Sequence, residues 1–411
     1  MTRVITRIEV EGFRSFRDCA VDLSPFTVLV GQNGSGKTNL LEAIDLAARL
    51  TGGADTNTWW ESADGVHWTG DLRPGAGLRG RVVDLFHRYG DGTAADRIGI
   101  ALCFLQSDAS HGMRHLRLVL EITREGEAAR PVVRGTVTLL PDAPAAWGLS
   151  AEQETEIRRN AELGTSFERS SPGGRWYGLA PDAGEARQEA DLHDDERMAR
   201  DAHNLSAVLG RMLGPREETA HEALLLKADA VAVLPGLTDL SAAADPHRGA
   251  WELELGYRDA APTPARLASD GTLHVLAVLA AAHDRGGPDE YAFVHHVRRF
   301  NACTTLMVED VENGLHPGQV KELVRRLRRR TGPGTLQQII VTTHSPVVLA
   351  AVYPDHPGDV LFVDTVTRVG GGATPSRHSR IRPLAESGER GTYVPAREAR
   401  QYLETARAGD G

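Results

Sequence analysis

The residues with the most recognisable chemistry occupy positions 31–38, which read GQNGSGKT. They fit the pattern GxxxxGK followed by Ser or Thr, and they lie between an apolar run at 26–30 and a segment with helical spacing at 38–50. Glycines let consecutive backbone N–H groups turn toward phosphate oxygens, and a helix that begins here directs the positive end of its dipole at them. The sequence therefore predicts a phosphate-binding loop between a strand and a helix.

This loop predicts a role for its functional side chains. Lys37 is expected to reach the β- and γ-phosphates of ATP, and the Thr38 hydroxyl is expected to ligate Mg²⁺. A chance glycine-rich turn is disfavoured because the strand, the helix and further motifs follow in order. The predicted nucleotide-binding residues of the loop are Gly31, Gln32, Asn33, Gly34, Ser35, Gly36, Lys37 and Thr38.

Two later apolar runs end in residues of reactive type. The run at 304–308 is followed by the carboxylates Glu309 and Asp310, and the run at 338–342 continues into Thr-His-Ser-Pro with His344. A phosphate-loop enzyme needs carboxylates across from the loop, one to help hold Mg²⁺ and one to polarise the attacking water. The alternative for the acidic pair is a solvated turn. A single histidine is usually structural or exposed, but its place after these motifs favours a functional role.

The segment at 7–44 carries a family resemblance. Its sequence, RIEVEGFRSFRDCAVDLSPFTVLVGQNGSGKTNLLEAI, resembles the opening of RecF-like and SMC-like ATPases, in which a first strand ends in FRS and the loop helix begins TNLLEAI. The resemblance implies an ATP-binding-cassette head rather than a kinase or a GTPase. It also implies that Arg14 touches the nucleotide, and an ordinary surface arginine is the alternative.

The acidic segment at 306–317, LMVEDVENGLHP, resembles the extended Walker B motif of cassette ATPases grouped with the overcoming-lysogeny (OLD) and RecF-like proteins. The usual form has two glutamates, Pro, Glu and then GLHP. By this resemblance Glu309 is the Mg²⁺-side carboxylate and Asp310 is the catalytic base. The chain departs from the pattern at Val311, which replaces Pro, and at Asp310, which is one methylene shorter than Glu. The shorter base predicts slow hydrolysis, and Glu312 is an alternative base.

The same families imply roles for two further segments. The resemblance places His344 near the γ-phosphate, where imidazole relays a hydrogen bond between the phosphate and the water. The segment at 265–282, ARLASDGTLHVLAVLAAA, resembles the signature segment, usually LSDGT. It implies that Ser269 and Gly271 contact the γ-phosphate held by the loop of a partner protomer. Taken alone, SDGT before a helix is explained by an N-cap and a turn.

The order of elements and the resemblance predict an α/β fold, a P-loop NTPase head of the ABC-ATPase type with a mixed central sheet, an antiparallel β subdomain and a helical insertion lobe. β-like runs are expected at 98–104, 116–122, 132–140 and 231–258. Helices are expected at 151–163, 185–212, 215–230 and 271–283, and the tail from 367 as loop with one short helix. The expected division is 1–149 for the N-terminal ATPase part, 150–283 for the insertion lobe and 284–411 for the C-terminal ATPase part.

The composition is that of a globular protein: 411 residues, 41% hydrophobic, 25% charged, with a net charge of -10. The longest apolar run, at 275–282, is far shorter than the ~20 residues that cross a bilayer, and the N-terminus lacks the apolar stretch of a secretory signal. We therefore expect a cytoplasmic protein without a membrane partner.

Cys19, Cys103 and Cys303 are scattered, which excludes a disulfide framework. The acidic excess argues against a strongly basic nucleic-acid-binding protein, although KELVRRLRRR at 321–330 is either a solvated face or a local nucleic-acid contact.

The motifs together with the family resemblance imply a Mg²⁺-dependent ATPase that forms a homodimer around ATP. The resemblance implies a switch in DNA repair or maintenance, or in anti-phage defence, with DNA and a separate effector such as a nuclease or toxin as partners. Two alternatives stay open: an ATP-dependent assembly scaffold with little or no hydrolysis, and a transporter nucleotide-binding subunit. The transporter is disfavoured because 230 residues separate Thr38 from Ser269 and the sequence LSGGQ is missing.

Overall fold

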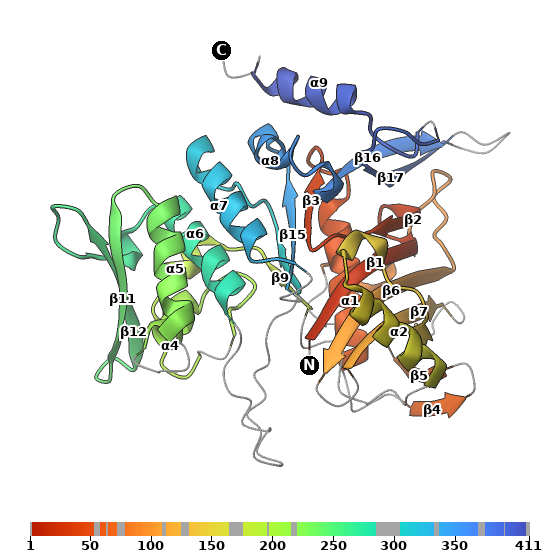
Figure 1. The fold of residues 1–411 in the computed structure, drawn as a ribbon, viewed down its shortest axis with the longest axis horizontal. Helices are drawn as coiled ribbons and strands as arrows, with labels where there is room; N and C mark the ends of the chain where they lie inside the picture. The colour runs from red at the N-terminus through yellow and green to blue at the C-terminus, as the bar shows by residue number, and fades with distance from the viewer. Residues whose placement is uncertain are drawn as a thin grey trace.

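The structure is a computed structural model in which two large β-sheets pack on opposite sides of one helix, with a smaller lobe beside them (Figure 1). The described residues are 2–52, 58–62, 65–71, 79–108, 112–124, 131–163, 176–194, 197–214, 220–284, 305–332, 337–368, 375–389 and 391–407. Cys303 lies outside these residues. No described helix is both long enough and apolar enough to cross a membrane.

The first sheet is antiparallel throughout, with the strand order β2-β1-β6-β7-β8-β5-β4. Its strands are β1 (Thr2–Phe13), β2 (Phe16–Asp22), β4 (Thr58–Ser62), β5 (Gly65–Asp71), β6 (Arg97–Asp108), β7 (Gly112–Thr123) and β8 (Val132–Leu140). This confirms the predicted antiparallel subdomain. The sequence analysis did not predict β2, β4 and β5. In β2 most side chains are partly or fully exposed, so pairing with β1 defines the strand rather than an apolar pattern.

The second sheet is the predicted mixed central sheet, in the order β17-β16-β3-β15-β14-β9. Its strands are β3 (Phe26–Val30), β9 (Trp176–Leu179), β14 (Thr305–Val308), β15 (Gln338–Thr343), β16 (Val360–Arg368) and β17 (Ser376–Pro383). All neighbours pair in parallel except β16 and β17. Every residue of β3, β14 and β15 is buried, which explains why these strands are continuous apolar runs. Because parallel strands end at one edge, the three motifs that follow these strands meet there.

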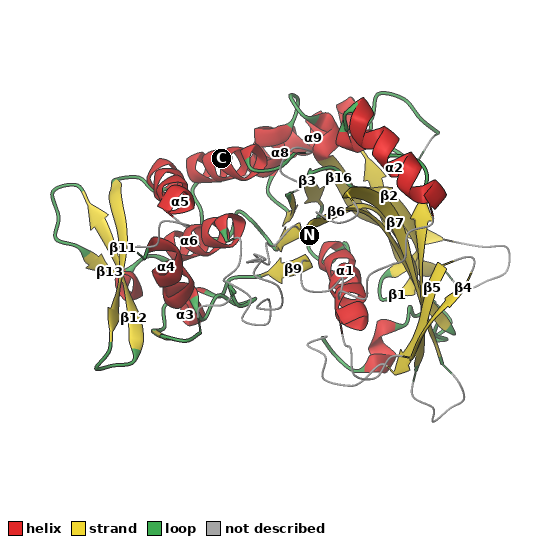
Figure 2. Cartoon of the chain, turned by 60° about the horizontal axis from the view of Figure 1, so that its bottom comes forward, coloured by secondary structure: helices red, strands yellow, loops and turns green. Residues whose placement is uncertain are grey.

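Helix α1 (Lys37–Gly52) lies between the two sheets (Figure 2). Its buried residues Leu40 and Ile44 belong to one core with Leu118 of the first sheet and with Met307 and Ile340 of the central sheet. The opposite face of the central sheet packs in a second core with α6 (Asp270–His283), α7 (Pro317–Arg329) and α8 (Pro346–Val352). The loop helix is thereby fixed between the sheets, which holds its N-terminus at the end of β3.

The insertion lobe contains strands as well as helices. Its elements are α3 (Ala183–Ala186), β10 (Ala190–Asp191), α4 (Leu205–Leu213), α5 (Ala220–Val233), β11 (Leu237–Asp245), β12 (Ala250–Tyr257), β13 (Thr263–Pro264) and α6. The predicted continuous helix at 185–212 is wrong. Ala202 has a φ of 66°, and the Asn204 side chain binds the backbone of Ala199, Asp194 and Arg197, so side-chain hydrogen bonds fold this stretch into turns before α4.

The tail also differs from the prediction, because β17 is a strand where loop was expected. Its sequence, SRHSRIRP, is rich in charged and polar residues, but β17 pairs with β16 along its whole length. Only then does the predicted terminal helix follow, as α9 (Ala396–Arg407).

The expected division of the chain at 149 and 283 stays a proposal. Helix α2 (Ala151–Leu163) packs on β7 and β8, and β9 joins the central sheet.

Candidate nucleotide-binding site

The phosphate-binding loop joins β3 to α1 at the edge where the parallel strands end. Gly34 and Gly36 have φ angles of 77° and 107°, which L side chains rarely adopt. A Cβ atom at Gly36 would lie 2.2 Å from Ser379 Oγ, and one at Gly31 would lie 2.2 Å from the carbonyl oxygen of Val363. The path of the loop and the strands packed against it therefore require these glycines.

The Lys37 ammonium is buried inside the loop. Its Nζ donates hydrogen bonds to the carbonyl oxygens of Gly31, at 2.7 Å, and Gln32, at 3.1 Å. Burial lowers the pKa of Lys37, and nearby carboxylates oppose that shift. The buried Ser35 hydroxyl has no hydrogen-bond partner among the described residues. A buried cation and an unpaired hydroxyl at a helix N-terminus fit phosphate oxygens, so the residues present fit the ATP that the motif implies.

Glu309 lies at the end of β14, opposite the start of α1. Its Oε2 accepts a hydrogen bond of 3.0 Å from Thr38 Oγ1, and its backbone N–H donates to the Leu179 carbonyl of β9. Oε1 of Glu309 accepts a hydrogen bond from Arg200 of the insertion lobe. A hydroxyl and a carboxylate oxygen are the hard ligands that Mg²⁺ prefers, so Thr38 and Glu309 fit a Mg²⁺ site.

Asp310, Glu312 and His344 form a cluster in which one ligand atom of each residue lies within 4.8 Å of the others. His344 Nδ1 is 3.2 Å from Glu312 Oε1 and 3.7 Å from Asp310 Oδ1. Asp310 has a φ of 44°, and its N–H donates a hydrogen bond of 2.9 Å to Thr342 Oγ1. Since the side chains of Asp310 and His344 are each 49% exposed, water reaches both.

Arg14 lies beside α1, where its contacts are with protein groups. Its Nε is 2.8 Å from Glu42 Oε2, and its Nη2 donates to the backbone carbonyl of Arg79 at 2.7 Å. Burial lowers the pKa of Arg14, and the charge of Glu42 opposes that shift. The φ of Arg14 is 48°, so the turn between β1 and β2 holds it in an unusual conformation. A contact between Arg14 and the nucleotide stays a prediction.

The signature residues begin α6 and contact the acidic loop. Ser269 is the N-cap of α6, and its Oγ accepts a hydrogen bond of 3.2 Å from the Thr272 N–H. Gly271 packs so closely on the acidic loop that a Cβ atom there would lie 2.3 Å from the Gly314 carbonyl oxygen. One turn later, His274 Nε2 is 3.2 Å from the Val311 carbonyl oxygen. These contacts join the signature helix to the Walker B loop, and a role of Ser269 and Gly271 in a partner's site stays a prediction.

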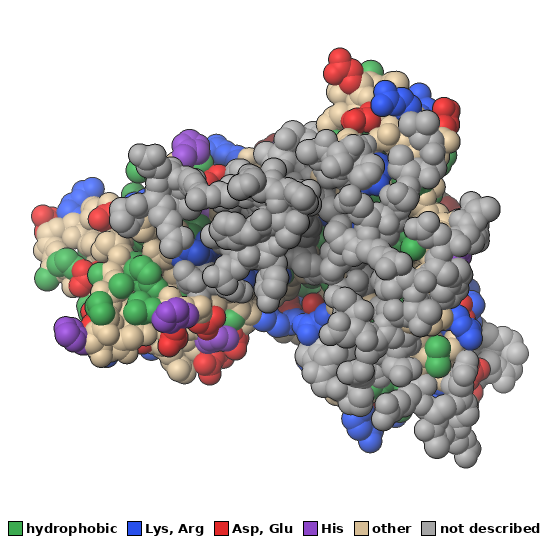
Figure 3. Space-filling model, turned by 90° about the horizontal axis from the view of Figure 1, so that it is seen from below, with side chains coloured by type: hydrophobic (Ala, Val, Ile, Leu, Met, Phe, Trp, Pro, Cys, Tyr) green, Lys and Arg blue, Asp and Glu red, His purple; other side chains and the backbone are tan. Residues whose placement is uncertain are grey.

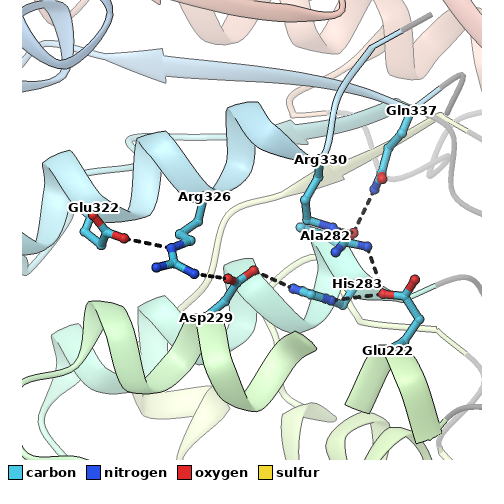
Figure 4. A network of polar contacts seen from close by, with 8 residues as sticks. All are labelled: Glu222, Asp229, Ala282, His283, Glu322, Arg326, Arg330 and Gln337. Carbon is cyan, nitrogen blue, oxygen red and sulfur yellow. Dashed lines mark hydrogen bonds and ion pairs between the residues drawn. The ribbon is translucent and has the colours of Figure 1, made fainter. Parts of the chain in front are cut away.

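The basic run at 321–330 forms most of α7, and four of its five arginines are paired with carboxylates of the described residues. The pairs are Arg325 with Glu322, Arg326 with Glu322 and Asp229, Arg328 with Asp359, and Arg330 with Glu222. Figure 4 shows that this network also surrounds His283, whose Nδ1 is 3.2 Å from Glu222 and whose Nε2 is 2.9 Å from Asp229. These ion pairs join α5, α6 and α7. They weaken the case for a nucleic-acid contact through this helix.

Sequence reasoning missed Arg200, the place of Glu312 at His344, and Tyr402. Tyr402 of α9 donates a hydrogen bond of 3.0 Å from its hydroxyl to the His344 carbonyl oxygen. Neither Arg200 nor Tyr402 belongs to a local motif, and each lies far along the chain from its partner. The spacing of Glu312 within the acidic segment was the one available signal.

Two family models match parts of the chain. One, described as "AAA domain, putative AbiEii toxin, Type IV TA system", matches residues 252–350, which contain the signature, the acidic pair and His344. The other, described as "AAA ATPase domain", matches residues 4–54, which contain the phosphate loop. The two matches therefore cover the segments that meet at the edge of the central sheet.

Several curated proteins are similar over short stretches. A DNA replication and repair protein RecF from Rhizobium leguminosarum is 29% identical over 133 residues, which are 32% of this chain and 27% of that protein. A RecF from Nocardioides is 46% identical over 48 residues, 11% of each chain. An OLD nuclease from Thermus scotoductus is 46% identical over 43 residues, 10% of this chain and 8% of that protein. The matched stretches thus span about a quarter or less of the length of these relatives.

The fold resembles that of SMC head domains in solved structures. An SMC head bound to the C-winged helix domain of ScpA covers 93% of this chain, and this chain covers 98% of it, with a TM-score of 0.52 and 15% identity. The Pyrococcus furiosus SMC head bound to the C-terminal domain of ScpA covers 98% of this chain, and this chain covers 100% of that head. The TM-score is 0.50 and the identity is 13%. The matched segments are thus similar to AAA ATPase domains and to RecF and OLD nuclease sequences, and the fold resembles that of SMC heads.

Proposed function

We propose that the chain is the ATPase head of a molecular switch, in which two protomers close around ATP and Mg²⁺ and separate after hydrolysis. The observation that best supports this proposal is the convergence of Lys37, Glu309 and His344 at the ends of β3, β14 and β15. In the proposed dimer, Ser269 and Gly271 of one protomer face the phosphate loop of its partner. ATP shifts the equilibrium between separated protomers and the closed dimer only to the extent that it binds the closed dimer more tightly.

The proposed mechanism assigns one task to each group of the site. The loop N–H groups and Lys37 bind the phosphates, and Thr38 and Glu309 hold Mg²⁺. Mg²⁺, when bound, neutralises charge on the phosphate oxygens. Asp310 orients the attacking water and accepts its proton, and Nε2 of His344 accepts a second hydrogen bond from the same water. The exposed side chains of Asp310 and His344 and the buried ammonium of Lys37 support this division of tasks.

A second candidate is an assembly scaffold that binds ATP with negligible turnover. Two features of Asp310 favour it: the side chain is one methylene shorter than Glu, and the residue is held at a φ of 44°. The shorter side chain reaches less far toward a water molecule, and the left-handed backbone sets the direction in which the carboxylate points. Both candidate functions use the same nucleotide site, so only a measurement of ATP turnover distinguishes the scaffold from the ATPase.

The proposed biological setting is DNA repair or maintenance, or anti-phage defence, in the cytoplasm with a separate effector. The similarity to RecF and OLD nuclease sequences supports this setting. On the face shown in Figure 3, basic and acidic side chains are mixed among the described residues. We therefore propose that DNA binding is modest, salt-sensitive and dependent on ATP, through phosphate contacts at local basic patches or through the effector.

The test is phosphate release by the wild type, Asp310→Asn and Lys37→Ala proteins, with light scattering to follow dimerisation. We expect turnover in the wild type, loss of turnover with retained ATP-dependent dimerisation in Asp310→Asn, and loss of both in Lys37→Ala. Asn tolerates left-handed backbone angles, so Asp310→Asn removes the base without adding strain. Equal, near-zero rates in wild type and Asp310→Asn with intact dimerisation would support the scaffold instead.

A further inference from the structure

Glu312 is a buried carboxylate that collects hydrogen-bond donors from the turn after β15. Its side chain is 9% exposed. One oxygen, Oε1, accepts hydrogen bonds from Thr343 Oγ1 at 2.7 Å, the His344 N–H at 2.9 Å and the Ser345 N–H at 3.0 Å. Three donors offset the cost of burying the charge, so this carboxylate fixes the backbone on both sides of the His344 peptide.

The same oxygen also faces the imidazole ring of His344. Nδ1 of the ring is 3.2 Å from Glu312 Oε1, closer than its 3.7 Å to Asp310 Oδ1. From the other side, the Tyr402 hydroxyl holds the His344 carbonyl at 3.0 Å. Because Nδ1 faces carboxylates, the opposite ring nitrogen, Nε2, is left for another partner.

The burial of its other oxygen excludes Glu312 as the catalytic base. Oε2 exposes less than 1 Å² and has no hydrogen-bond partner among the described residues. A general base has to reach the water whose proton it accepts. Oε2 is out of reach of water and Oε1 is occupied by donors, whereas Asp310 is 49% exposed. The structure therefore separates the tasks of the two carboxylates.

We infer that Glu312 is a positioning residue for His344. Its carboxylate accepts the Nδ1–H of His344 and so fixes the tautomer in which the lone pair of Nε2 is presented to the attacking water as a hydrogen-bond acceptor. A histidine is commonly controlled in this way, through the hydrogen bond of its second nitrogen. This inference rests on the proposed ATPase function and assigns Glu312 a role that acts only through His344.

The kinetic test compares Glu312→Gln, His344→Ala and the double variant by kcat, KM and ATP affinity. Gln keeps an oxygen that accepts the three backbone and hydroxyl donors but removes the charge. We expect Glu312→Gln to lower kcat roughly 10- to 100-fold, by analogy with the loss when a metal-ligating histidine loses its orienting partner, with little change in ATP affinity. In the His344→Ala background the same substitution is expected to have no further effect on kcat. An added loss in the double variant would contradict the inference.

Two further variants test whether a loss of kcat in Glu312→Gln comes from general destabilisation and whether it depends on the carboxylate charge. Glu222→Gln is the matched control, because Glu222 also lies 3.2 Å from a histidine Nδ1, that of His283, in the ion-pair network of α5, α6 and α7. It is expected to lower stability and leave kcat unchanged. Glu312→Asp keeps the charge, and its kcat is expected to lie between those of the wild type and Glu312→Gln. If Glu312→Asp is as slow as Glu312→Gln, charge is not what Glu312 contributes.

A second readout does not depend on turnover. In nucleotide-free protein labelled with ¹⁵N-histidine, the ring nitrogens of His344 are assigned by their loss in His344→Ala. We expect a protonated Nδ1 in the wild type and a shift toward the Nε2–H tautomer in Glu312→Gln. An unchanged spectrum would overturn the inference even in an inactive protein. Absent turnover in the wild type with the expected spectral shift would refute the ATPase proposal and keep the Glu312 assignment.

Discussion

Thr38 and Glu309 lie 271 positions apart in the chain, and the Thr38 hydroxyl donates a hydrogen bond of 3.0 Å to Oε2 of Glu309. The other oxygen of Glu309 accepts a hydrogen bond from Arg200 of the insertion lobe. One carboxylate is thus shared by the phosphate loop and the insertion lobe. In the proposed site, Mg²⁺ would therefore compete for Glu309 with an arginine of the same chain.

The substitution Arg200→Ala is expected to lower the Mg²⁺ concentration needed for ATP binding. The Arg200 and Glu309 side chains are 39% and 18% exposed, so solvent screens the pair and the expected effect is about two- to fivefold. The measurement is ATP affinity in a Mg²⁺ titration. Arg248→Ala, which breaks an exposed pair with Glu189 in the same lobe, is the control and is expected to change nothing. A higher Mg²⁺ requirement in Arg200→Ala would mean that Arg200 supports the site.

The substitution Gly271→Ala is expected to destabilise the nucleotide-free protein by about 1–3 kcal/mol, because a Cβ atom would lie 2.3 Å from the Gly314 carbonyl oxygen. The obstacle is backbone, so α6 or the Walker B loop has to move. Urea unfolding without nucleotide measures this effect apart from any dimer contact. Gly358→Ala is the matched control, since a Cβ atom there meets nothing within 4 Å. Equal stability of the two variants would show that the contact is unimportant.

The substitution Asp310→Glu is expected to raise kcat several-fold, because the longer side chain reaches further toward the attacking water. The φ of 44° at this position opposes the gain in kcat. Glu adopts left-handed backbone angles less readily than Asp, so the substitution is expected to strain the backbone and lower stability. Phosphate release measures the first effect and thermal unfolding the second. A lower kcat at unchanged stability would show that the site is built for the shorter aspartate.

Asp229 is expected to stabilise the protein in a pH-dependent manner. Burial alone would raise the pKa of Asp229, but hydrogen bonds from His283 and Arg326 outweigh it and hold the pKa below its ordinary value. A depressed pKa in the folded state gives stability above the unfolded pKa, about 3.9, that is lost as the pH falls through the folded pKa. Asp229→Asn is therefore expected to cost about 2 kcal/mol at pH 7, with a deficit that shrinks below about pH 4.

Urea unfolding at several pH values checks this prediction. Asp239→Asn is the control, because Asp239 pairs with Lys227 at a 60% exposed position and its loss is expected to cost under about 0.5 kcal/mol. A deficit of Asp229→Asn that stays constant down to acid pH would mean that the Asp229 charge contributes nothing and that packing explains the loss.

The parts of the site that sequence reasoning found share one property. The phosphate loop, the Glu309–Asp310 pair and His344 each follow a fully buried strand, and a buried parallel strand has an apolar run that is visible without the fold. The missed elements lack that signal. Strand β17, SRHSRIRP, is rich in charged and polar residues, and the turns before α4 depend on side-chain hydrogen bonds of Asn204.

The sequence by itself determined the chemistry: a phosphate loop, an acidic pair and a histidine, in an order that predicts an ABC-type ATPase head. Local spacing suffices for this, because each motif is contiguous. Only the tertiary structure decided which groups face each other. The contacts of Glu309 with Thr38 and Arg200, of Glu312 with His344, and of Gly271 with Gly314 cross long stretches of chain. Strand order and helix packing create such contacts, and no periodicity in the sequence encodes them.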